Sequence, residues 1–121
     1  MKYALLIYGL PEFRDLPEDH LKSVVGEYEA IRDAPGVLDG MQLQGTESAT
    51  TVRVQNGEAL LSDGPFVDAK EFIGGFYLLE ADNLDEATAL AARVPAARMG
   101  GAVEVRPIVG AKPAARRGLP R

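Results

Sequence analysis

The residues with the most potential for chemistry are a single histidine and a carboxylate in a tight turn. His20 is the only histidine of the chain, and imidazole is well suited to general acid–base catalysis near neutral pH. It follows Glu18 and Asp19, so the alternative is a solvated residue in a first helical turn. Asp63 precedes Gly64-Pro65, where its carboxylate could accept a proton or simply cap the turn. The sequence leaves both alternatives open.

Four further residues are candidates for ligand binding. Lys70 lies in a mixed-charge cluster and could anchor an anion, although such clusters are commonly solvated surface. Tyr8 could offer a hydroxyl to a pocket, or belong to the core with that hydroxyl satisfied. Gly74 and Gly75 interrupt an apolar run, which indicates a β-bulge or the close approach of a backbone or ligand.

The same inventory excludes several kinds of site. The chain has no cysteine, so disulfides and thiolate metal sites are impossible. One histidine rules out a His-rich metal site, and carboxylates alone bind transition metals weakly. The sequence has no phosphate loop, dinucleotide-binding glycine pattern or serine-nucleophile elbow. We therefore expect neither a metal nor a cofactor.

Charge is distributed unevenly along the chain. Residues 1–111 carry 9 basic and 18 acidic residues, whereas residues 112–121 carry four basic residues and no acidic one. An acidic body argues against direct nucleic-acid binding, which needs basic surface. We expect one domain over residues 1–109 and a basic, disordered tail over 110–121; contact of the tail with an acidic partner is the alternative.

The N-terminal apolar run is short. Residues 3–8 cannot form a signal-peptide core or cross a membrane, and they are typical of a buried strand. No targeting segment is visible, so we expect a cytoplasmic protein.

Hydrophobic periodicity predicts alternating strands and helices around a hairpin. The expected strands cover 2–8, 37–44, 50–54, 58–61, 72–80 and 102–108, and the expected helices run over 17–34 and from Asn83 to Pro95. Asn56-Gly57 between two β-prone runs is a strong hairpin signal. Asn83 and Glu86 have capping-box spacing. This order predicts an α+β, ferredoxin-like split βαβ fold with an inserted β-hairpin.

Both faces of the predicted sheet are apolar. In the strand 72–80, alternation places Phe72, Phe76 and Leu78 on one face and Ile73, Tyr77 and Leu79 on the other. Two helices can cover only one face, so the other face needs a second cover. We expect a homodimer with its sheets packed face to face; the alternative is a hairpin folded over the open face of a monomer.

The chain resembles the DGPF branch of the YCII-related proteins. The resemblance lies in Asp63-Gly64-Pro65-Phe66, with supporting segments at residues 3–8, 74–77, 81–87 and 103–108. It implies a dimeric α/β-barrel of the ferredoxin-like type. YCII-related proteins are thought to use a His–Asp pair in a cleft, which would be His20 and Asp63 here.

The resemblance implies two alternative functions. The first is a small cofactor-free lyase, isomerase or hydrolase that acts on a small molecule, as does a family relative that dehydrochlorinates a chlorinated aromatic diol. The second is a ligand-sensing or sigma-factor-associated regulatory module without catalysis.

Overall fold

The computed structural model describes residues 1–9, 15–66 and 72–110. The strands are β1 (Lys2–Gly9), β2 (Val37–Gln42), β3 (Thr50–Gln55), β4 (Glu58–Asp63), β5 (Phe72–Glu80) and β6 (Ala102–Pro107). The helices are α1 (Glu18–Arg32), α2 (Leu84–Ala91), α3 (Pro95–Arg98) and a short 3₁₀ turn, η2 (Thr46–Ser48). No described helix has the length and apolar character needed to cross a membrane.

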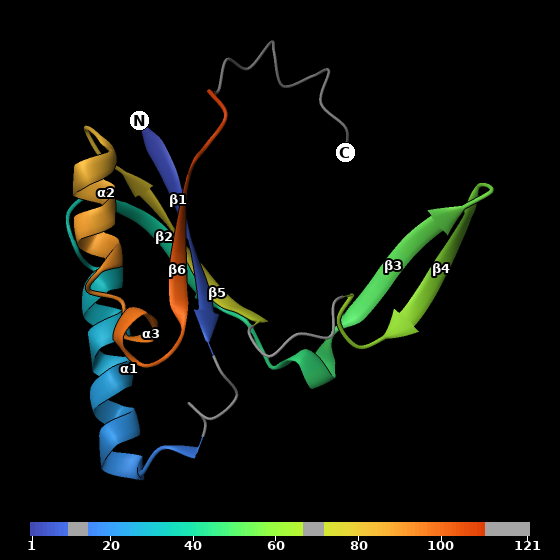
Figure 1. Ribbon diagram of the computed structural model, residues 1–121, viewed down its shortest axis with the longest axis horizontal. Helices are drawn as coiled ribbons and strands as arrows, with labels where there is room; N and C mark the ends of the chain where they lie inside the picture. Colours follow the sequence, from blue (N-terminus) through green and yellow to red (C-terminus); the bar gives the residue numbers. More distant parts are fainter. Residues whose placement is uncertain (10–14, 67–71, 111–121) are drawn as a thin grey trace.

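Four strands form one antiparallel sheet in the order β2-β5-β1-β6. Together with the helices between its strands, this order is that of the predicted ferredoxin-like split βαβ fold. All three α-helices lie on one face of the sheet (Figure 1). Strands β3 and β4 form a separate two-stranded sheet, which is inserted in the sequence between the two halves of the fold. The predicted fold with an inserted hairpin is therefore confirmed.

The hydrophobic core lies between the sheet and the helices. Alternate residues of the two central strands are buried there, and the helices supply the facing side chains: Tyr3, Leu5, Ile7, Tyr77 and Leu79 meet Ile31, Ala87, Leu90 and Val94. The Tyr77 hydroxyl donates a hydrogen bond of 2.7 Å to the carbonyl oxygen of Tyr28 in α1. Burial raises the pKa of Tyr77 to about 12, because the phenolate would be poorly solvated there.

A β-bulge at Gly74 changes the side-chain alternation of β5. Ile7 pairs with Gly75 but Tyr8 pairs with Ile73, so Gly74 is the extra residue. Ile73 therefore shares the open face with Tyr8, and its predicted place beside Tyr77 and Leu79 is wrong. The bulge itself was predicted from the double glycine and is confirmed.

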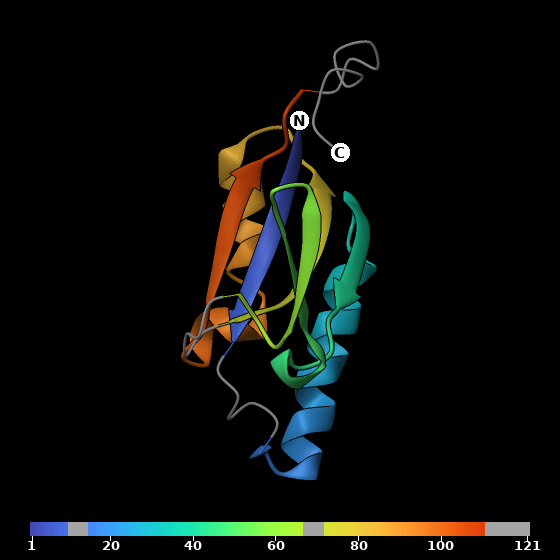
Figure 2. The ribbon, with the colours of Figure 1, turned by 90° about the vertical axis from the view of Figure 1, so that its right-hand side faces the viewer.

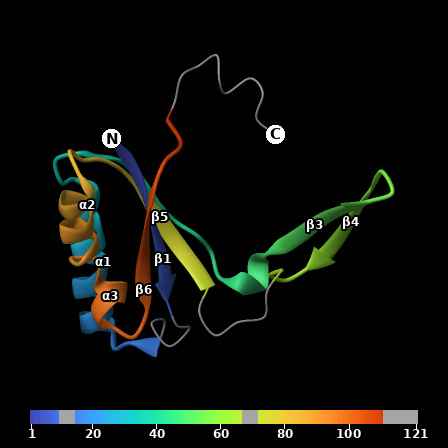
Figure 3. The same cartoon turned by 45° about the horizontal axis from the view of Figure 1, so that its top comes forward.

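The hairpin does not cover the open face of its own sheet. Asn56 and Gly57 both have positive φ, at 53° and 79°, as a tight two-residue hairpin turn requires. From its base the hairpin extends away from the body, on the side of the sheet opposite the helices (Figures 1 and 3). Figure 2 looks onto the open sheet face from the side to which the hairpin projects, so the hairpin overlaps the sheet in that view although it extends away from it in Figure 1.

The helix ends follow the sequence signals closely, with one exception. Asn83 caps α2 by accepting a hydrogen bond of 2.9 Å from the backbone N–H of Glu86, as predicted. Helix α2 ends at Ala91 rather than at Pro95 as predicted, and Pro95 is the first residue of α3. Proline suits this position because the first helical N–H has no partner within the helix.

Candidate functional site

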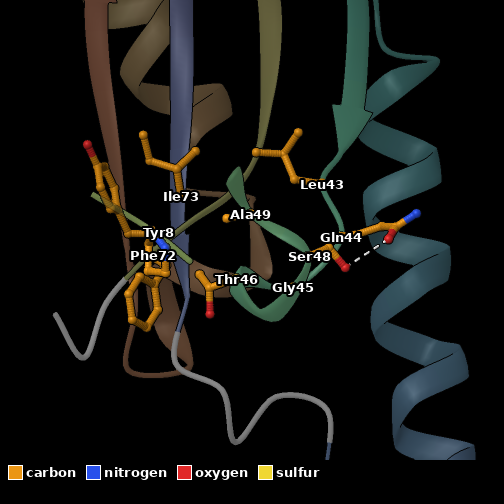
Figure 4. A pocket seen from close by; sticks show the side chains of 10 residues that line it. Tyr8, Leu43, Gln44, Gly45, Thr46, Ser48, Ala49, Phe72 and Ile73 are labelled. Carbon is orange, nitrogen blue, oxygen red and sulfur yellow. Dashed lines mark hydrogen bonds between the residues drawn. The ribbon is translucent and has the colours of Figure 1, made fainter. Parts of the chain in front are cut away.

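The described residues line an open pocket of about 720 Å³ at one end of the open sheet face. It lies between the ends of the two central strands and the η2 turn (Figure 4). One wall is apolar and consists of Tyr8, Leu43, Phe72 and Ile73. The other consists of Gln44, Gly45, Thr46, Ser48, Ala49 and Pro65. A volume of this size accommodates a small organic molecule.

The polar groups of the pocket are few and come mainly from the η2 side. Thr46 contributes a hydroxyl, and Ser48 donates a hydrogen bond of 3.1 Å to Oε1 of Gln44. None of the ten lining residues is an Asp, Glu, Lys, Arg or His. A pocket with mostly apolar walls and a few hydroxyl and amide groups favours a ligand without a strong charge.

Tyr8 forms part of this pocket through its ring. Its hydroxyl lies 3.4 Å from Oε1 of Glu104 on β6, and Nε of Arg106 donates a 3.0 Å bond to the same oxygen. In Figure 4 the hydroxyl points away from the η2 turn. The structure thus places Tyr8 at the pocket, with its ring rather than its hydroxyl facing the space.

Asp63 lies at the base of the hairpin, beside the pocket. It is the last residue of β4, is exposed, and pairs with Thr50. The next two residues connect it to the site: Gly64 donates a 2.8 Å bond to the carbonyl of Ala49, and Pro65 lines the pocket. Thr51 also donates a 2.7 Å bond to the Gly64 carbonyl, so the turn is held firmly against the η2 segment.

His20 lies elsewhere. It is exposed on the first turn of α1. The pKa of Glu27 is lowered mainly by its hydrogen bond from Arg98, with a smaller contribution from the charge of His20. His20 therefore lies on the helix side of the sheet, where α1 packs (Figure 1). Helix α1 and the hairpin lie on opposite sides of the sheet (Figure 1), so a single chain does not bring His20 and Asp63 together. The pairing of His20 with Asp63 therefore stays a prediction.

The two glycines have different positions. Gly74, at the bulge, lines a smaller hollow that adjoins the pocket. Gly75 is buried, and a Cβ on it would meet the carbonyl oxygen of Met41 at 2.7 Å. The close approach predicted at this glycine is therefore made by the backbone of β2. Lys70, the remaining predicted ligand-binding residue, lies outside the described residues.

Sequence reasoning missed most of the pocket. The sequence patterns predict nothing for the segment between the strands expected at 37–44 and 50–54, although Gly45, Thr46, Ser48 and Ala49 supply part of one wall. Their run of small polar residues after a strand is a weak signal, because the same composition is common in every surface loop. Ile73 was missed because the bulge reverses its direction. Within the described ranges, no cluster of three or more His, Cys, Asp or Glu side chains could hold a metal ion.

Comparison with known proteins identifies the family to which this chain belongs. The model of the YCII-related domain matches residues 1–112, so this chain belongs to the YCII-related family. Its fold resembles that of 5-chloro-2-hydroxyhydroquinone dehydrochlorinase (TftG) from Burkholderia phenoliruptrix AC1100, solved with 2,5-dihydroxybenzoquinone. The TM-score is 0.52 at 17% identity, over 89% of this chain and 93% of the other. At that identity the likeness shows the shared fold.

A curated relative has no assigned function. The chain is 42% identical over 69 residues to the uncharacterised protein R00369 of Rhizobium meliloti (strain 1021). The match spans 56% of each chain, so it covers little more than half the length of that relative.

Proposed function

We propose that this protein binds a small ring compound bearing hydroxyl or carbonyl groups in the pocket between β1, β5 and the η2 turn. The observation that carries the proposal is the lining itself. Aromatic and aliphatic side chains of Tyr8, Phe72 and Ile73 form one wall, and the other wall includes the hydroxyls of Thr46 and Ser48. A flat ring can pack on the first wall while its substituents meet the second.

The fold comparison supports this ligand class. The dehydrochlorinase that shares the fold is named for a chlorinated hydroxyhydroquinone and was solved with a dihydroxybenzoquinone. Both compounds are small rings with oxygen substituents, which is the chemistry that the pocket walls favour.

The test is a titration with hydroquinone, followed by amide chemical shifts in NMR spectra. We expect the largest shifts at Thr46, Ala49 and Ile73, because these residues line the pocket. Ala49→Phe fills the space and should weaken binding at least ~10-fold, or about 1.4 kcal/mol. Ala89→Phe, on the exposed surface of α2, is the matched control and should leave binding unchanged. Shifts that lie elsewhere, or equal affinities in the two variants, would refute the proposal.

Catalysis at this pocket is the second candidate. The position of Asp63 favours it, because the DGPF turn holds this carboxylate two residues from Pro65 in the pocket wall. Asp63 would then act as the acid or base of a cofactor-free lyase, isomerase or hydrolase, and His20 is its proposed partner on the strength of the family resemblance. Asp63→Asn should abolish turnover and leave ligand binding intact. Binding without turnover in the native protein would instead favour the ligand-sensing module, for which a sigma factor is the proposed partner.

A further inference from the structure

The β3–β4 hairpin, here called the arm, has one apolar face. Paired residues on neighbouring strands point to the same face, and the pairs alternate along the hairpin. One face carries Arg53, Leu60 and Ser62 with other polar residues. The opposite face, called the apolar face of the arm, carries Val52, Val54, Ala59 and Leu61, with Thr50 and Asp63 on the same face at its base.

This apolar face is uncovered by the described part of the chain. Val54 is 71% exposed and Leu61 is 69% exposed. The described hydrogen bonds between the arm and its surroundings lie at its base, at Ala49, Thr51 and Gly64. A lone two-stranded hairpin is marginally stable in water at best, so an apolar face kept in this position indicates a partner surface.

The open face of the sheet is uncovered on the same side of the molecule. It carries Ala4, Leu6, Met41, Ile73, Phe76 and Leu78, by pairing and alternation. Its charged edge is already neutralised within the chain, because Arg106 pairs with Glu104 at 3.0 Å. Both surfaces expose large apolar side chains within the described residues, such as Met41 at 55% and Leu61 at 69%, and contiguous exposed apolar surface marks an interaction site.

A second copy of this chain fits both surfaces. Two sheets packed face to face lie about 10 Å apart, whereas a strand of this length spans roughly 20 Å. An arm that leaves one sheet on its open side therefore extends past that gap and alongside the second copy (Figures 1 and 3). A two-fold pairing covers both arms and both sheets at once, because each copy supplies the same surfaces.

We propose that the arm grips a second copy of this chain through Val52, Val54, Ala59 and Leu61, and that the copy held in this way closes the pocket. The pocket lies where the arm leaves the sheet, between the η2 turn and Ile73. Tyr8 and Ile73 of the open sheet face line the pocket, so a copy that covers this face also covers the pocket. The closure of the pocket rests on the proposed ligand-binding function, whereas the grip of the arm does not.

Two neighbouring leucines provide a matched pair of variants. Leu61→Lys puts a charge on the apolar face of the arm, and Leu60→Lys puts the same charge on the opposite face, where Leu60 is already 45% exposed. Sedimentation velocity should show a dimer for the native chain, at least ~10-fold weaker dimerisation for Leu61→Lys, and little change for Leu60→Lys. A monomeric native chain, or equal effects of the two variants, overturns the proposal.

Intermolecular NMR contacts test the arm without relying on a variant. In a mixture of isotope-labelled and unlabelled native chains, filtered spectra should show contacts from the Val52 and Val54 methyl groups to the other copy. A dimer without such contacts, or the same contacts arising only within one chain, overturns the proposed grip.

Hydroquinone separates this inference from the proposed function. If the arm contacts are present but hydroquinone shifts no pocket residue, the ligand-binding function fails and the arm stands. If Leu61→Lys is monomeric yet binds hydroquinone as tightly as the native chain, the closure of the pocket fails and the function stands. We expect Leu61→Lys to bind at least ~10-fold more weakly.

Discussion

At the scale of single residues, two tyrosines of similar sequence context have different environments. Tyr8 and Tyr77 both occupy apolar strands, but alternation turns Tyr77 toward the helices and Tyr8 toward the open face. The Tyr77 hydroxyl donates to a helix carbonyl in the core, and the Tyr8 hydroxyl lies beside Glu104 at the sheet edge. Of these two tyrosines, Tyr8 alone lines the pocket, and it does so through its ring.

The buried phenol of Tyr77 makes stability depend on alkaline pH. Folding raises the pKa of Tyr77 from 10.0 to about 12, chiefly by burial. The folded chain therefore holds a proton that the unfolded chain releases, so this contribution is complete below pH 10 and is lost as pH rises to about 12. We expect Tyr77→Phe to lose less stability over that interval, although it removes a hydrogen bond of roughly 1 kcal/mol at neutral pH.

Urea unfolding at a series of pH values measures this difference. Burial also raises the pKa of Tyr28, so a smaller slope should remain in the variant. Identical slopes in the native and variant proteins would show that Tyr77 does not titrate as its buried position requires.

At the scale of secondary-structure elements, the double glycine of β5 shapes the pocket. Gly74 is the bulge residue and Gly75 lies against the backbone of β2. We expect Gly75→Ala to destabilise the fold by about 1–3 kcal/mol, because its Cβ would meet the Met41 carbonyl at 2.7 Å. Gly74→Ala is the control: the nearest described atom to its Cβ is the Ile7 carbonyl oxygen at 4.0 Å. Chemical denaturation compares them, and equal losses would contradict this account.

The elements were predictable from sequence where the signal is local. Alternation located β5, Asn56-Gly57 located the hairpin turn, and Asn83 with Glu86 located the start of α2. The direction of Ile73 was not predictable from periodicity, because a single bulge residue inverts the alternation before it. The η2 wall was equally hidden, since its role depends on how a non-local strand approaches it.

At the scale of the whole molecule, the candidate site depends on what covers the open face. The sequence correctly indicated that both faces of the sheet are apolar. It could not indicate that the hairpin extends away from the body, because that direction is set by the short connections at its base. The pocket lies at this base, so the same turn positions Asp63, a pocket wall and the arm.

An arm-held dimer should melt at a temperature that depends on protein concentration. Unfolding of a dimer releases two chains, so a tenfold rise in concentration stabilises it by about 1.4 kcal/mol. For two chains of 121 residues, that corresponds to a rise in Tm of roughly 3 °C. Leu61→Lys should melt at a lower temperature than the native chain at the same concentration, because its dimer is weaker, whereas Leu60→Lys should follow the native chain. A native Tm that does not change with concentration would mean that the apolar face of the arm stays exposed in the folded protein, and the pocket would then have to bind its ligand open to water.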